Sequence, residues 1–158
     1  MKQIIQGLID EKQYVYLSDL TSNDQIKDEN QLKQIIQVFI DNEWYGSLTN
    51  LIYSDKIKDE NKVKEIIQGF INNGKYDYLY YLINFNRIKD ENQVKEIIQV
   101  LIDNKQYKYL YRLIRDEDKI KDENQLKQSI QVFIDKKKYD DLSYLIKDDK
   151  IKDNNMVK

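Results

Sequence analysis

The side chains that could do chemistry in this chain are carboxylates, lysines, tyrosines and a few arginines. The 158 residues include no His and no Cys, which excludes Ser-His-Asp and Cys-His nucleophilic sites, zinc sites with thiolate or imidazole ligands, and the usual haem or iron–sulfur ligation. The run Asp116-Glu117-Asp118 lacks the glycine and the ligand spacing of a calcium loop. We therefore predict no catalytic residue, no metal site and no cofactor, and a protein that is not an enzyme.

Carboxylates also recur in pairs such as Asp28-Glu29 at regular intervals along the chain. Acidic side chains at a helix N-terminus are stabilised by the helix dipole, and this accounts for their placement. Each pair follows a lysine in a ladder of five: Lys27, Lys58, Lys89, Lys121 and Lys152. Because every one of these lysines is followed by Asp and the net charge is −2, we interpret them as solvated helix entrances and do not expect nucleic acid as the partner. Stacking of single-stranded nucleic acid on the interleaved tyrosines is a remote alternative.

Tyrosine and arginine concentrate together in the middle of the chain. The arginines are Arg87, Arg112 and Arg115, and every other basic residue is lysine. Both residue types are enriched at protein–protein hot spots, because they offer a large, stiff contact area and forked donors. We predict that the partner-binding surface consists of Tyr78, Tyr80, Tyr81, Tyr109, Tyr111, Arg112 and Arg115. The alternative is that the helix carrying them is more buried than its pattern suggests.

These residues belong to an internal repeat. The string Ile-Lys-Asp-Glu-Asn begins at positions 26, 57, 88 and 120, and Ile-Lys-Asp-Asn-Asn begins at position 151. The spacings are 31, 31, 32 and 31 residues, and the extra residue falls in the link at 115–119. Repeats of this length indicate stacked supersecondary units, each of which buries its apolar face against its neighbours.

Each repeat contains two predicted helices. Asp28 is placed as an N-cap, with Gln31 three residues later as in a capping box. Apolar residues then recur at helical spacing from Leu32 to Ile40, which predicts a first helix ending near Asp41. A short polar turn follows, and a second helix carries Tyr45 and an apolar stripe. In two repeats Lys62 and Met156 replace the glutamine, so only the Asp cap is expected there.

The pattern predicts an all-α fold, a right-handed α-solenoid of about five 31-residue antiparallel helix pairs. One domain covers residues 1–158, with partial units at both ends. A tyrosine opens the second helix of every repeat, at Tyr14, Tyr45, Tyr76, Tyr107 and Tyr139. We interpret this ladder as packing between repeats, with the hydroxyl groups at the surface.

The segment 72–83, Asn-Asn-Gly-Lys-Tyr-Asp-Tyr-Leu-Tyr-Tyr-Leu-Ile, resembles the inner turn and second helix of an ankyrin repeat. Tetratricopeptide and pentatricopeptide repeats share a similar Gly-x-Tyr entry into the helix. The chain is thus similar to a divergent αα-hairpin repeat protein. The resemblance covers each helix pair and implies binding of macromolecules through stacked helix faces. It assigns no functional residue.

The first helix of one repeat is split between the two ends of the chain, with its start in the last residues and its continuation in the first residues. Residues 1–2 and 157–158 occupy the same position in the repeat. Three interpretations remain open: a boundary unrelated to the fold, a frayed C-terminal tail, or head-to-tail association in which 151–158 of one copy docks beside residues 2–10 of the next. The apolar residues expected in that contact are Ile4, Ile5, Leu8, Ile151, Met156 and Val157.

The sequence predicts a protein-binding repeat module or scaffold that uses the tyrosine- and arginine-rich helix face. A self-assembling structural subunit, joined head to tail as a homo-oligomer, is the alternative. No apolar run approaches 18 residues and the first residues are too polar for a signal-peptide core. We therefore expect an intracellular protein with no membrane partner.

Overall fold

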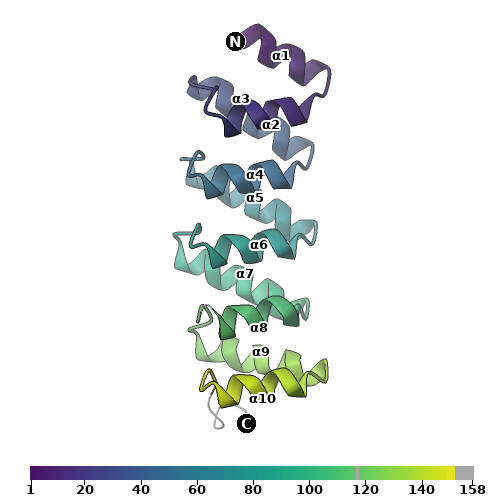
Figure 1. The fold of residues 1–158 in the computed structure, drawn as a ribbon, viewed down its shortest axis with the longest axis vertical. Helices are drawn as coiled ribbons and strands as arrows, with labels where there is room; N and C mark the ends of the chain where they lie inside the picture. The colour runs from purple at the N-terminus through teal and green to yellow at the C-terminus, as the bar shows by residue number, and fades with distance from the viewer. Residues whose placement is uncertain (117, 152–158) are drawn as a thin grey trace. The chain divides into compact units, whose positions relative to one another are not determined.

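The computed structural model describes residues 1–116 and 118–151, and these residues form ten α-helices and no β-strand (Figure 1). The all-α prediction of consecutive helix pairs is therefore confirmed. None of the described helices is long and apolar enough to cross a membrane. The helices are α1 (Lys2–Asp10), α2 (Tyr14–Ser22), α3 (Glu29–Asp41), α4 (Tyr45–Tyr53), α5 (Glu60–Asn72), α6 (Tyr76–Asn84), α7 (Glu91–Asp103), α8 (Tyr107–Arg115), α9 (Glu123–Asp135) and α10 (Tyr139–Lys147).

The longer helices begin at aspartate N-caps, as the repeat predicts. The Asp28 carboxylate accepts the backbone N–H groups of Asn30 and Gln31, at 2.8 and 3.0 Å. Asp90 and Asp122 make the same pair of bonds, whereas Asp59 accepts from Asn61. These bonds satisfy backbone donors that the first turn of a helix leaves without partners.

The longer helices end in left-handed residues that are mostly not glycine. After α3, Glu43 has a φ of 56°. Its N–H donates to the carbonyl of Ile40, and the N–H of Trp44 donates to the carbonyl of Phe39. This is the Schellman pattern, which turns the chain sharply enough to bring the next helix back antiparallel. Gly74 holds this position after α5, with a φ of 62°.

The chain forms two compact units, Met1–Asn73 and Gly74–Lys158. In the first unit, α1 packs against α2 and α3, and α4 packs against α2, α3 and α5. Its core is built from apolar side chains at equivalent repeat positions, so that Ile5, Leu17, Phe39, Leu48 and Phe70 are almost completely buried.

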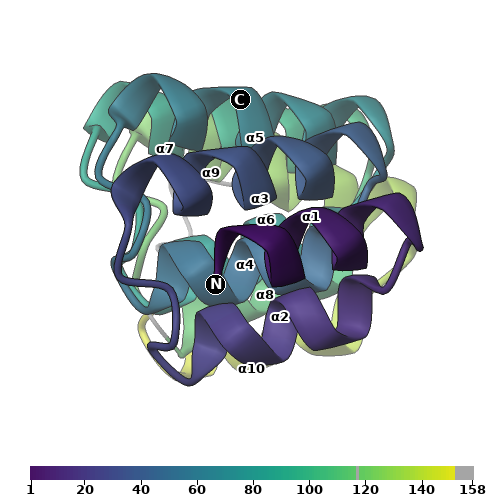
Figure 2. The ribbon, with the colours of Figure 1, turned by 90° about the horizontal axis from the view of Figure 1, so that it is seen from above.

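In the second unit, α6, α8 and α10 form one layer, and α7 and α9 form the other (Figure 2). The core between these layers includes Leu79, Ile97, Leu110 and Phe133. The layer of α6, α8 and α10 carries the predicted partner-binding residues, and the packing of α6 against α8 brings them together.

The tyrosine ladder makes contacts between repeats within each unit. The Tyr14 hydroxyl donates to Oδ1 of Asn42 at 3.0 Å, and its ring lies edge-on to Trp44. In the second unit the Lys138 ammonium lies 4.5 Å from the centre of the Tyr107 ring. These contacts are the packing between repeats that the sequence predicts for the tyrosine ladder. Tyr139 is exposed, because no helix follows α10 among the described residues.

Candidate protein-binding surface

The predicted partner-binding residues all lie on α6 and α8, and they divide into buried, half-buried and exposed members. Tyr80 is buried, whereas Tyr81, Arg112 and Arg115 are exposed. Tyr78, Tyr109 and Tyr111 are half-buried. The expectation that all of them lie on surface not needed for packing is therefore wrong for Tyr80.

Tyr80 is buried because it faces the next helix of its own layer. Its ring centre lies 5.4 Å from that of Tyr109 on α8 and 5.5 Å from that of Tyr81. The same two repeat positions meet in the first unit, where the Ser47 hydroxyl donates to the Ser18 hydroxyl at 2.8 Å. The tyrosine pair thus fills a position of inter-repeat packing with two large rings. Aromatic pairs in this range of distances add stability beyond the area they bury.

Tyr111 and Arg115 form a second cluster further along α8. The Tyr111 ring lies edge-on to Phe133 of α9, and the Arg115 guanidinium lies 4.9 Å from the centre of the Tyr111 ring. Arg115 also donates from Nη2 to the carboxylate of Asp116 at 3.0 Å. This hydrogen bond holds the pKa of Asp116 below its usual value. The charge of Arg115 is therefore already paired within the chain.

The exposed part of the site combines a stacked aromatic pair with positive charge. Tyr81 and Phe85 stack with ring centres 6.3 Å apart, and both are nearly half exposed. The exposed Arg112 guanidinium lies 5.9 Å from the centre of the Tyr80 ring. Neither Arg112 nor the exposed Lys108 has a carboxylate within ion-pair distance among the described residues. We call Tyr81, Phe85, Lys108, Tyr109 and Arg112 the Tyr–Arg surface.

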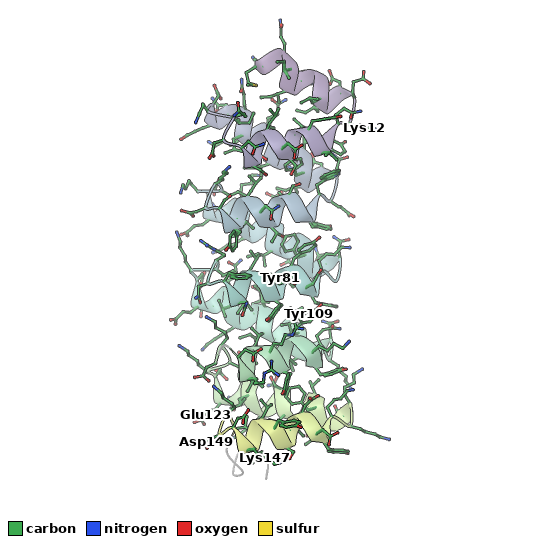
Figure 3. The ribbon with its side chains drawn as sticks, in the orientation of Figure 1. Lys12, Tyr81, Tyr109, Glu123, Lys147 and Asp149 are labelled. Carbon is green, nitrogen blue, oxygen red and sulfur yellow. The ribbon has the colours of Figure 1, made fainter. Side chains whose placement is uncertain are left out.

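Tyr109 joins the buried and exposed parts of this surface. Figure 3 labels Tyr109 on α8 and Tyr81 on α6, the neighbouring helix of the same layer. Burial raises the pKa of the Tyr109 hydroxyl, and the nearby Asp77 carboxylate raises it further, while the Arg112 charge acts in the opposite direction. Tyr109 is therefore a neutral hydroxyl group at neutral pH, available to donate or accept one hydrogen bond.

Two members of the Tyr–Arg surface, Phe85 and Lys108, were not predicted from the sequence. Phe85 follows α6 at a position where the other repeats carry Asn23, Ser54, Asp116 and Asp148. Comparing the links between repeats would have identified it as the one aromatic residue at that position. Lys108 lies one turn before Arg112 on α8, so both cations belong to one row of the helix.

The residues predicted for self-association fall into three groups. Ile4 is exposed and Leu8 is half-buried, as a contact surface requires. Ile5 and Ile151 are buried, so the expectation that they lie open at the ends is wrong. Ile5 is covered because α1 packs against both α2 and α3, and Ile151 is buried like its counterparts Ile57, Ile88 and Ile120. Met156 and Val157 lie outside the described residues.

A hollow of about 250 Å³ lies beside α7 and α9. Its charged lining includes Glu91, Lys95, Lys119 and Asp122. The Lys95 ammonium lies 3.5 Å from the Asp122 carboxylate, and Lys119 donates to Asn86. The backbone N–H of Gln125 and the Lys95 charge hold the pKa of Asp122 below its usual value. Lys95, Lys119 and Asp122 are thus occupied by structural contacts, and the described residues contain no cluster of three or more potential metal ligands.

Comparison of the chain with protein-family models, with curated proteins and with solved structures found no match.

Proposed function

We propose that this chain is a non-enzymatic protein-binding module or scaffold that engages its partner through the Tyr–Arg surface. In this proposal it is a divergent αα-hairpin repeat protein, with weakly ankyrin-like helix pairs, working inside the cell. The observation that carries the proposal is the exposed Tyr81–Phe85 stack beside Arg112, which has no carboxylate within ion-pair distance among the described residues. Exposed aromatic rings next to an arginine are typical of interface hot spots, because they bury a large area at little cost in side-chain entropy.

The chemistry of the surface favours an acidic partner segment with an apolar side chain. Lys108 and Arg112 lie four residues apart on α8, so their charges can meet two carboxylates of one segment. An aromatic or leucine side chain of the same segment would cover the Tyr81–Phe85 stack. Placement of Arg112 over the Tyr80 ring orients its guanidinium and reduces the entropy lost on binding.

A peptide-display selection on the immobilised chain tests this proposal. We expect enriched peptides that combine Asp or Glu with Leu, Phe or Trp. The double variant Tyr81→Ser/Arg112→Gln should weaken their affinity by at least about tenfold, because it removes both kinds of contact. Binding is measured by fluorescence polarisation and helix content by circular dichroism.

Tyr53→Ser is the matched control. Tyr53 is as exposed as Tyr81, at 45% against 46%, but it lies on α4 outside the Tyr–Arg surface. This variant should bind the selected peptides like the wild type. The proposal fails if no peptide is enriched, or if the folded double variant binds as tightly as Tyr53→Ser. Preferential binding of a single-stranded oligonucleotide at the same surface would favour nucleic-acid recognition instead.

A further inference from the structure

Helices α3 and α4 pack against α1 and α2 through one face of the repeat. The equivalent face of α1 and α2 is not covered by any described helix. Ile35 is fully buried, whereas Ile4, at the same position one repeat earlier, is 58% exposed. Ser47 is buried, whereas its counterpart Tyr16 is 59% exposed. The repeat therefore places large apolar side chains on α1 and α2 where another helix pair would cover them.

The opposite face of the repeat is uncovered on α10. Tyr139 is 58% exposed, whereas its counterpart Tyr45 is buried and Tyr14 and Tyr107 are half-buried. Ser143 is exposed, whereas its counterpart Ser18 is half-buried and bonded to the following repeat. Among the described residues, α9 and α10 thus present the side of the repeat that normally receives the next helix pair.

We infer that these two faces bind each other between two copies of the chain, with α9 and α10 of one copy docked on α1 and α2 of the next. This inference does not depend on the Tyr–Arg surface, because none of that surface's residues lies in the contact. The occupant is a second copy because the contacts between repeats within the chain already show how such faces fit together.

Polar contacts between repeats recur at fixed positions, and this predicts the pairs across the new contact. Gln34 donates to Gln6 at 3.1 Å in the first unit, and Gln99 donates to Gln128 at 2.8 Å in the second. These bonds join the same two repeat positions in both units. The equivalent pair between copies is Gln131 with Gln3.

Two further contacts transfer in the same way. The bond from Tyr14 to Asn42 predicts that Tyr139 of one copy donates to the Glu11 carboxylate of the next. The Lys105–Asp135 ion pair, at 3.5 Å, predicts a pair between Lys137 and Asp10. A neutral donor therefore meets a carboxylate and a cation meets an anion, so no like charges oppose each other at these positions.

The apolar part of the contact is also complementary in size. The position pair that holds Ser18 with Ser47 holds Tyr80 with Tyr109 in the second unit, so it accepts side chains of different sizes. Across the new contact it would hold the small Ser143 against the large Tyr16. Such a contact joins unlike faces, so it produces a ring or an open filament instead of a symmetric dimer.

Mass as a function of concentration tests the inference. Light scattering should give a mass that rises above the monomer value of 19.2 kDa as the wild-type protein is concentrated. Ile4→Asp should remain at the monomer mass over the same range, because it places a charge in the apolar contact. Circular dichroism verifies that its helices are intact.

Val15→Asp is the matched control. Val15 is as exposed as Ile4, at 58%, but its repeat position is also exposed at Asp77 and Lys108 and so lies outside the contact. This variant should associate like the wild type. A wild-type mass that stays at the monomer value at every concentration, or equal loss of association in both variants, would overturn the inference.

Cysteine trapping identifies the faces directly, because the chain contains no cysteine. A mixture of the single variants Tyr16→Cys and Ser143→Cys should form mainly the mixed disulfide dimer under mild oxidation. Replacing Ser143→Cys in the mixture with Asn50→Cys, an exposed position outside the contact, should not enrich the mixed dimer. Association without the mixed dimer would show that the copies meet through another surface and would overturn the inference.

Discussion

At the scale of single residues, neighbouring tyrosines of α6 occupy different environments. Tyr80 is 5% exposed and packs on Tyr109, whereas Tyr81 is exposed and stacks on Phe85. One helical step rotates a side chain by about 100°, which here separates an inter-repeat contact from the solvent. Residue type alone therefore does not distinguish a tyrosine that packs between repeats from one that is exposed.

Replacement of these two tyrosines by serine should affect stability very differently. Tyr80→Ser removes a buried ring and should lower the free energy of unfolding by about 3 kcal/mol, the range expected when a large core side chain is truncated. Tyr81→Ser should change it by less than about 1 kcal/mol, because the ring is largely in solvent. Urea denaturation measures both values. Equal losses would show that the two rings are buried to the same extent.

At the scale of helices, the chain's turns depend on left-handed residues that are usually not glycine. Lys12, Glu43, Lys105 and Lys137 all have φ between 52° and 56°, a region in which a side chain is strained. The Schellman hydrogen bonds hold the backbone there despite this strain. The antiparallel turn is thus imposed by the backbone bonds that end the helix, with glycine used only at Gly74 among these turns.

Exchanging lysine and glycine at these turns should move stability in opposite directions. Lys12→Gly should raise the free energy of unfolding by about 0.5 kcal/mol, since the strain it relieves exceeds the added flexibility of the unfolded chain. Gly74→Lys should lower it by about 1 kcal/mol; the added Cβ itself meets only ordinary contacts, at 3.6 Å from the Tyr76 ring. Urea denaturation of dilute protein measures both changes, and a loss of stability in Lys12→Gly would contradict the strain argument.

At the scale of the whole molecule, stability should vary along the repeats. Each helix pair is stabilised mainly by its neighbours, so the approximate stability of such a chain is a sum over repeats and the contacts between them. Helix α1 buries only Ile5 and has no side-chain N-cap, whereas α3 buries Ile35, Ile36 and Phe39 and is capped by Asp28. Local opening of α1 therefore costs less free energy than opening of α3.

Hydrogen exchange should reveal this difference. In dilute protein, amides of α1 should exchange faster than those of α3, as measured residue by residue by NMR or mass spectrometry. Raising the concentration should slow exchange in α1, α2, α9 and α10, where the second copy is expected to bind. Equal protection of α1 and α3 in dilute protein would show that α1 is stabilised by contacts other than those described.

The sequence by itself determined where the helices begin and which side of each is apolar. Aspartate caps such as Asp28 and the spacing from Leu32 to Ile40 act within one or two turns, so they can be recognised without knowing the neighbouring helix. The sequence also located the candidate surface on α6 and α8. Only the tertiary structure decided which of those side chains remain exposed. Tyr80 and Ile5 are buried because side chains of other helices lie opposite them, and the spacing within one helix does not show which side chains those are. Tyr109, which covers Tyr80, belongs to the next repeat.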